Sequence, residues 1–281
     1  QPAYVRRQRQ MCIRDRFYGG APHEASRTEE EKAAFGCALH DTMDLWYSHQ
    51  GTTVYLLTKL PEGATRKAGY DDSGWTTYER RSAEQIKKVF LYDAQWKLVL
   101  DLGVGADAER SRNWPLDPDG FNALIEKKTF TNGADKDAVK ELYRKMGINQ
   151  LGGIEVLDFM GIAEPTVEDM EQLGRCLNLC KNLKTCNLTN VGLTDDTCRA
   201  LLSTLTDEAH IEELILNTNG LGAEVVTAVA AYTRVSGSLT ELLLAYNIIG
   251  AEGAKAVGES LRVNGSLTKL DVRANDIEGG A

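Results

Sequence analysis

No apolar run in this sequence approaches the roughly 18 to 20 residues that a helix needs to cross a bilayer, so we expect no membrane span. The Arg-rich start has no apolar stretch of the kind found in a secretory signal. No cysteine pair has the Cys-x-x-Cys spacing of a zinc site, and the four histidines show no metal-ligand spacing. With six cysteines scattered over 281 residues, we expect reduced thiols in a cytoplasmic protein that holds no metal and no cofactor.

An excess of positive charge is missing as well. The chain has a formal net charge of −9 and a pI of about 5.1, with no dense basic stripe. Because Lys and Arg supply much of the affinity for phosphate backbones, this composition gives no electrostatic support for nucleic-acid binding. The hydrophobic content of 42% and the charged content of 26% are ordinary for a globular protein and exclude a wholly disordered chain.

What the sequence does contain is a 28-residue repeat in its C-terminal half. Each unit has apolar residues at positions 1, 4 and 6, and three units have an asparagine at position 9. The units begin at Leu183, Ile211, Leu239 and Leu267, and the asparagines are Asn219, Asn247 and Asn275. A degenerate unit without the asparagine begins at Ile154, and Val191 occupies position 9 of the unit after it.

The repeat pattern predicts one strand and one helix in each unit. Positions 1, 4 and 6 would point into the core, and the asparagine amide would bond backbone groups that the turn leaves unpaired. Helical patterns follow at 195–205, 223–232 and 251–261, the last with Ala254, Val257, Gly258 and Leu261 on its buried face. We expect the turn at Val191 to be looser. Because no unit can bury its own apolar face, neighbouring units must stack.

These units resemble the ribonuclease-inhibitor-type leucine-rich-repeat family, and the resemblance covers the C-terminal half only. It implies an α/β solenoid with parallel strands inside and helices outside, whose concave sheet surface binds protein partners. Carried over to this sequence, the predicted partner-binding residues are Glu213, Ile215, Glu241, Leu243, Tyr246, Lys269, Asp271 and Arg273. Ile215, Leu243 and Tyr246 are the most informative, because exposed apolar and aromatic groups often mark an interface. Cover by other parts of the chain and ordinary surface are the alternatives.

Residues 17–149 favour a small α/β domain of unknown type. Patterns predict helices at 26–46, 75–90, 117–127 and 134–146, and strands at 52–58 and 96–102. Residues 1–16 match neither part and are expected to be a disordered or non-native leader, or a basic arm for an acidic partner. Residues 150–281 would then hold four to five repeats, with the last one cut off before its helix.

Two short motifs in residues 17–149 could carry chemistry. Ser73, Trp75 and Glu79 resemble the small-x-W-x-x-x-E arrangement of Toll/interleukin-receptor-like domains, which implies NAD cleavage by the glutamate, although Thr76 stands where a cysteine is usual. The alternative is a packing role for Trp75 and Tyr78, with Glu79 paired to a neighbouring arginine. The stretch 115–126 is similar to a calcium loop, but Pro115 occupies the place of its first carboxylate, which favours a helix start instead.

The leading hypothesis for function is a non-enzymatic interaction or scaffold protein that binds an unidentified protein partner through the repeats. One alternative is a signalling protein whose Toll/interleukin-receptor-like domain hydrolyses a nucleotide under control of the repeats. Another is a structural subunit of a large assembly. The repeat pattern defines a shape and does not identify the ligand.

Overall fold

The computed structural model describes residues 28–30, 33, 37, 47–59, 62–63, 69–88, 90–91, 96–101, 112–206 and 208–277. The chain divides into two compact units, Gln1–Met43 and Asp44–Ala281, and the strands and helices from Val54 onward all lie in the second unit. The predicted leader and most of the helix predicted at 26–46 lie outside the described residues. Within the described residues, no helix is long and apolar enough to cross a membrane.

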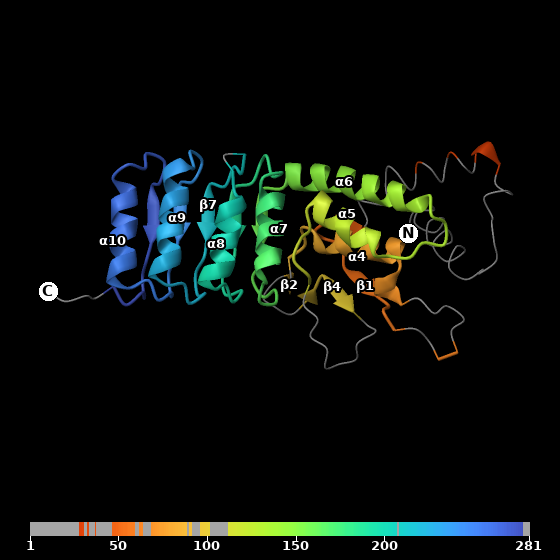
Figure 1. Cartoon of the computed structure of the whole chain (residues 1–281), viewed down its shortest axis with the longest axis horizontal. Coiled ribbons are helices and arrows are strands. Elements are labelled where there is room, and N and C mark those ends of the chain that lie inside the picture. Colours follow the sequence, from red (N-terminus) through yellow and green to blue (C-terminus); the bar gives the residue numbers. More distant parts are fainter. Residues whose placement is uncertain are drawn as a thin grey trace. The chain divides into compact units, whose positions relative to one another are not determined.

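The C-terminal half forms a five-stranded parallel sheet whose strands follow one another in sequence order (Figure 1). The strands are β5 (Val156–Asp158), β6 (Thr185–Asn187), β7 (Glu213–Ile215), β8 (Glu241–Leu243) and β9 (Lys269–Asp271). They are connected by α7 (Val167–Leu177), α8 (Asp195–Thr204), α9 (Ala223–Val235) and α10 (Gly250–Leu261). This arrangement confirms the predicted mixed α/β repeat-like fold, with one strand and one helix in each unit.

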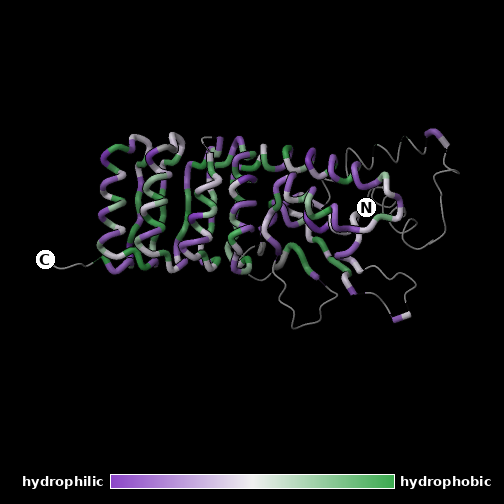
Figure 2. The backbone as a smooth tube through the Cα atoms, in the orientation of Figure 1, coloured by the Kyte–Doolittle hydropathy of each residue, from purple (hydrophilic) through white to green (hydrophobic). Residues whose placement is uncertain are grey.

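The repeated apolar positions form the core between the sheet and the helices. In the unit of β7, the side chains of Ile211, Leu214 and Leu216 are fully buried, as the period predicted. Figure 2 shows apolar residues recurring along the strands and alternating with polar ones along the helices. Burying this surface contributes roughly 25 cal/mol for each Å² of apolar area, and most of that area becomes buried only when units stack.

The predicted buried face of α10 is confirmed at Val257 and is wrong at Gly258 and Leu261. Gly253, Val257 and Ser260 are buried, whereas Leu261 is 39% exposed and Gly258 is also exposed. A Cβ atom on Gly253 would lie 3.2 Å from the Cα atom of Ala223 in α9. The close approach of α10 to α9 therefore sets the rotation of this helix, and a pattern read within one helix cannot show it.

The asparagines at position 9 make the backbone bonds that the sequence predicted. The Asn247 amide donates to the carbonyls of Leu216 (3.1 Å) and Leu244 (2.8 Å), and its oxygen accepts from the backbone N–H groups of Asn219 (3.0 Å) and Leu221 (3.1 Å). Asn219 and Asn275 repeat this pattern in the adjacent units. Each asparagine thus bonds its own turn and the turn of the unit before it, which couples neighbouring units.

The turn at Val191 differs from the expectation of looseness. Val191 is buried, and its backbone N–H donates to Asn219 Oδ1 of the next unit at 3.0 Å. The missing asparagine instead affects the preceding turn, where Ile162 N–H donates to the carbonyl of Phe159 at 3.0 Å. The reason is that the side-chain oxygen of each asparagine accepts from the turn of the preceding unit, so a substitution at position 9 also changes the bonding one unit earlier.

The N-terminal half is also mixed α/β. β1 (Val54–Leu56) pairs in parallel with β4 (Val99–Asp101), and β2 (Phe90–Leu91) pairs antiparallel with β3 (Trp96–Lys97). The helical elements are η3 (Tyr70–Asp72), α4 (Gly74–Glu84), α5 (Pro118–Glu126) and α6 (Asp135–Gly153). These elements match most of the predicted helices and strands in type.

Two helix ends in this half differ from the prediction, and tertiary contacts explain both. α4 stops at Glu84 rather than near residue 90, and the next backbone carbonyl, that of Gln85, accepts from Arg112. The Gln85 side-chain amide donates to the Leu116 carbonyl. α6 continues to Gly153 instead of ending near residue 146. Burial of Leu151 in the core outweighs the cost of about 1 kcal/mol for each glycine in its last turns.

The N-terminal half packs against the first repeat. Trp114 lies 5.3 Å from the Phe159 ring, and its indole N–H donates to the Ala163 carbonyl at 3.0 Å. Ile86, Trp114 and Leu151 belong to the same hydrophobic cluster as the repeats. These contacts cover the end of the repeat core at β5. The domain limits proposed from the sequence stay a prediction, and the limit at 149/150 falls within α6.

Candidate functional site

The open face of the sheet is the side turned away from α7–α10, and positions 3 and 5 of each unit lie on it. Position 4, between them, is buried against the helices, so side-chain alternation directs positions 3 and 5 to the other side. Strand register aligns position 3 as a row of Val156, Thr185, Glu213, Glu241 and Lys269. Position 5 forms the adjacent row of Asp158, Asn187, Ile215, Leu243 and Asp271.

The cations of this face are bound by carboxylates of the same face. Lys269 Nζ lies 2.6 Å from Glu241 Oε2, and this hydrogen bond raises the pKa of Lys269. Arg273 donates to both oxygens of Asp271, at 2.9 and 2.7 Å, and these bonds lower the pKa of Asp271 and raise that of Arg273. These pairs neutralise the two cations at the β9 end of the open face.

The carboxylates of Glu212 and Glu213 are left with no cation within ion-pair distance among the described residues. Glu213 Oε2 accepts from the Thr185 hydroxyl at 2.9 Å, while Glu212 is exposed at position 2 of the same unit. The open face around β7 therefore carries net negative charge. An acidic surface of this kind attracts cationic groups and repels anionic ones.

Apolar side chains occupy the middle of the position 5 row. Ile215 and Leu243 are register partners on β7 and β8, and both are half-buried. The other members of the row are polar: Asp158, Asn187 and Asp271. Tyr246, three residues beyond Leu243, is 65% exposed and donates its backbone N–H to the Arg273 carbonyl at 2.9 Å.

The structure brings the predicted site residues together. Three of them lie in the position 3 row, three in the position 5 row, and Tyr246 and Arg273 lie in adjacent turns at the end of these rows; their role in binding stays a prediction. Sequence reasoning missed Ile248, which is 61% exposed at position 10. The signal was available, since Gly192, Gly220 and Asp276 occupy this position in the other full units.

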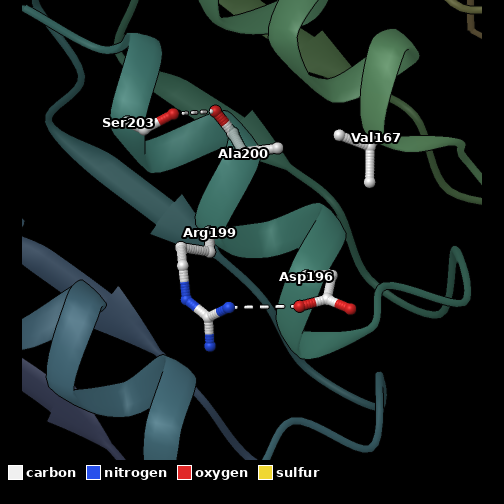
Figure 3. Close-up of a pocket in the computed structure, with 5 residues that line it drawn as sticks. All are labelled: Val167, Asp196, Arg199, Ala200 and Ser203. Carbon is white, nitrogen blue, oxygen red and sulfur yellow. Dashed lines mark hydrogen bonds and ion pairs between the residues drawn. The ribbon is translucent and has the colours of Figure 1, made fainter.

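A shallow depression of about 370 Å³ lies on the helix side of the repeats, at α7 and α8 (Figure 3). Its lining residues are Val167, Asp196, Arg199, Ala200 and Ser203. Figure 3 shows Arg199 directed at Asp196, 3.1 Å away, and Ser203 donating to the Ala200 carbonyl at 2.8 Å. Arg199 also lies 3.5 Å from Glu224. These polar groups bond to one another and do not form a nucleophile with a base.

Residues of the two motifs in the N-terminal half pack the core and cap a helix. Tyr78 is fully buried, and the Trp75 indole N–H donates to Asp135 at 2.9 Å, so the packing expected of both residues is confirmed. Glu79 is half-buried on α4, and its proposed role in NAD cleavage stays a hypothesis. Asp117 caps α5 by accepting from Gly120 N–H at 2.9 Å, which confirms the helix start. Among the described residues, no three His, Cys, Asp or Glu side chains are grouped to hold a metal ion.

A buried polar network in the N-terminal half had no clear sequence signal. Glu84 accepts from Arg80 Nε at 3.2 Å and from Asn113 Nδ2 at 2.9 Å, and the charged side chains of Arg80 and Glu84 are both buried. Burial lowers the pKa of Lys87 to about 8 and that of Arg112 to about 10. Arg112 also stacks over the Phe159 ring, 4.8 Å from its centre. The network thus links α4 to the segment before α5 and to the first repeat.

Comparison with known proteins does not place the chain in a family. No protein-family model matches it, and no curated protein matches it. One similar solved structure is described as "Leiomodin-1 Actin-Binding Site 2 (ABS2)", with 20% sequence identity and a TM-score of 0.41. The match covers 46% of this chain and 75% of that chain. Similarity at this level defines neither a family nor an activity for the chain.

Proposed function

We propose that the chain is a non-enzymatic interaction or scaffold protein whose ribonuclease-inhibitor-type leucine-rich repeats bind a protein partner on the open face. One observation carries this proposal: Ile215 and Leu243 stand side by side in a row whose other members are Asp158, Asn187 and Asp271. The core lies on the opposite side of the sheet and does not require apolar groups here. Adjoining solvent-facing apolar side chains are typical of interaction surfaces.

The surroundings of Ile215 and Leu243 have the composition of an interface. Apolar residues lie in the middle, while Glu213, Glu241 and Lys269 form a polar border. Tyr246 and Arg273, at the end of the rows, are the residue types most enriched among side chains that dominate binding energy. Three-residue strands in a continuous hydrogen-bonded sheet hold these groups in fixed register, so little conformational entropy is lost on binding.

The test replaces the apolar residues by those that the protein itself uses at the same position. In the variant Ile215→Asn with Leu243→Asn, position 5 carries the residue that the β6 unit has as Asn187. In affinity capture with cross-linking, we expect the wild-type full chain to retain specific partner bands that the double variant does not retain. The unfolding transition of the double variant should stay close to that of the wild type. Val263→Ser, which removes a 69% exposed side chain after α10, serves as the control and should leave capture unchanged. Equal capture by wild type and double variant would contradict the proposal.

A further inference from the structure

The turn after β8 departs from the turns of the neighbouring units at two positions. Position 8 holds Tyr246, where the other full units have Asn190, Thr218 and Ala274. Position 10 holds Ile248, where they have Gly192, Gly220 and Asp276. Tyr246 is 65% exposed and Ile248 is 61% exposed. One turn therefore presents two large apolar side chains at places where the same fold elsewhere uses small or polar ones.

The fold gives no reason for these two side chains. Tyr246 has φ 57°, a left-handed conformation that position 8 also has at Asn190, Thr218 and Ala274, and that a bulky residue adopts with difficulty. The backbone N–H of Tyr246 donates to the Arg273 carbonyl, and that of Ile248 donates to the Leu221 carbonyl. Any residue with an N–H group could make these bonds. Exposed apolar groups that the fold does not need are a signal of binding.

Tyr246 follows Leu243 in the chain and lies at the end of the open-face rows. Its N–H is bonded to the backbone of Arg273, whose guanidinium holds Asp271, and Asp271 is the register partner of Leu243. Ile248 follows two residues later in the same turn. We define the apolar strip as Ile215, Leu243, Tyr246 and Ile248. It runs from the middle of the sheet to the turn at the carboxyl end of β8.

The charges beside the apolar strip indicate what it binds. Lys269 and Arg273 are already paired with Glu241 and Asp271, so they offer little attraction to an anionic partner. Glu212 and Glu213 stand next to Ile215 with no cation within ion-pair distance among the described residues, and the chain as a whole has a formal net charge of −9. The complementary surface is apolar and flanked by Lys or Arg. An anionic membrane surface or a nucleic acid would be repelled.

We propose that the apolar strip docks a basic amphipathic helical segment of a partner protein, with its apolar side on Tyr246 and Ile248 and its Lys or Arg residues near Glu212 and Glu213. The inference rests on the proposed function and specifies the partner's chemistry. Docking of an amphipathic helix by its apolar side is a recurrent mode of peptide recognition, in which anchors at i, i+3, i+4 and i+7 supply the contacts. The acidic border supplies selectivity and a dependence on salt.

The test is a selection from a displayed library of random 16-residue peptides on the full chain. Counter-selection uses the variant Tyr246→Thr with Ile248→Gly, which carries the residues of the preceding unit, Thr218 and Gly220. We expect the retained peptides to be rich in Lys and Arg, with apolar residues at helical spacing. Their binding to the double variant should be at least tenfold weaker than to the wild type, and Glu212→Gln with Glu213→Gln should remove most of the salt dependence. Val263→Ser should change nothing.

Other results would overturn the inference or separate it from the proposed function. Retention of acidic peptides, or binding to the double variant within twofold of wild type, would overturn it. So would tighter binding to vesicles of phosphatidylcholine and phosphatidylserine than to any peptide, or a loss of self-association as the only effect of the double variant. If binding depends on Ile215 and Leu243 but not on Tyr246 and Ile248, the inference fails while the proposed function stands. If neither pair matters, both fail.

Discussion

The two halves of this protein bury polar groups in different ways. Every charged side chain that is buried among the described residues lies before the first repeat: Arg80, Glu84, Lys87, Arg112 and Asp117. The repeats bury polar side chains without charge, above all Asn247 and Asn275. In the repeats, one set of bonds recurs every 28 residues, whereas each bond of the N-terminal network occurs once.

This difference predicts which substitutions destabilise each half most. A buried charge that loses its partner is costly, because the remaining charge cannot return to water without local unfolding. A buried amide that loses a neutral partner costs less per group, but each asparagine serves several backbone groups at once. We therefore expect the substitution that lowers the free energy of unfolding most to lie in the N-terminal network. Substitutions of the repeat asparagines should have the next largest effect.

The largest effect is expected for Glu84→Ala. This change removes the buried carboxylate that Arg80 Nε and Asn113 share, and it leaves Arg80 with Asp71, 2.9 Å away, as its remaining carboxylate partner. It should lower the free energy of unfolding by about 3 to 5 kcal/mol. Urea denaturation followed by tryptophan fluorescence measures the loss. Glu126→Ala, which removes an exposed carboxylate bound to Lys136, is the matched control and should change stability little. A loss below about 1 kcal/mol for Glu84→Ala would remove the contrast between the two halves.

Asn247→Ala is expected to come next. It removes two donors and one shared acceptor that hold the turns of two units, and it should lower the free energy of unfolding by about 3 kcal/mol. The control is Asn190→Gly, in a turn position where Gly161 stands in the first unit, with an expected change of about 0.5 kcal/mol or less. If both variants have the same midpoint in urea, the asparagines are not the coupling between units.

A smaller, stabilising effect is expected for Lys87→Met. Burial lowers the pKa of Lys87 in the folded state to about 8, so below that pH the folded protein carries a charge in an unfavourable place. In the unfolded chain Lys87 has its ordinary pKa of 10.5 and stays protonated up to that pH. Between about pH 8 and 10.5 the unfolded chain therefore binds one more proton than the folded protein, and the free energy of unfolding of the wild type rises with pH. The variant should be more stable by about 1 kcal/mol at pH 7, and its advantage should shrink across that window. Lys88→Met, at an exposed lysine, is the matched control, and an equal profile for both variants would contradict the assignment.

The last prediction is that the four cysteines of the repeats do not react with an alkylating reagent in the native protein. Burial raises the pKa values of Cys180 and Cys198 to about 12, and it raises those of Cys176 and Cys186 as well. Iodoacetamide reacts with thiolates, so at pH 8 the native protein should be alkylated at the exposed Cys37 and not at these four. Peptide mass spectrometry checks this, and unfolding in urea should make all four reactive. Alkylation of Cys186 in the native state would show that the repeat core opens readily.

Sequence reasoning succeeded where local pattern and repetition agree. Position 4 of each unit enters the core, the asparagines bond the turns, and Asp117 caps α5, because these outcomes depend on residues near one another or one repeat apart. It failed at the buried face of α10 and at the ends of α4 and α6. Those depend on Ala223, Arg112 and the core around Leu151, which lie on other elements.

Some residues of the candidate site could likewise be predicted from the sequence, and others could not. The rows of the open face, with Glu213, Ile215, Leu243 and Lys269, could be placed from the repeat because strand alternation and register are periodic. Ile248 could have been singled out by comparing position 10 across the units, where Gly192, Gly220 and Asp276 stand elsewhere, but only the structure shows that its side chain is 61% exposed and not in the core.

By itself, the sequence determined the repeat, its apolar core positions and the residues that line the open face, because a fixed period turns spacing directly into position. The tertiary structure alone decided which charges are neutralised on that face, where Lys269 meets Glu241 and Arg273 holds Asp271. It also decided that Arg112 and Trp114 pack on Phe159 at the start of the repeats. Long side chains choose among several neighbours in space, and burial, charge and hydrogen bonding make that choice only after the chain has folded.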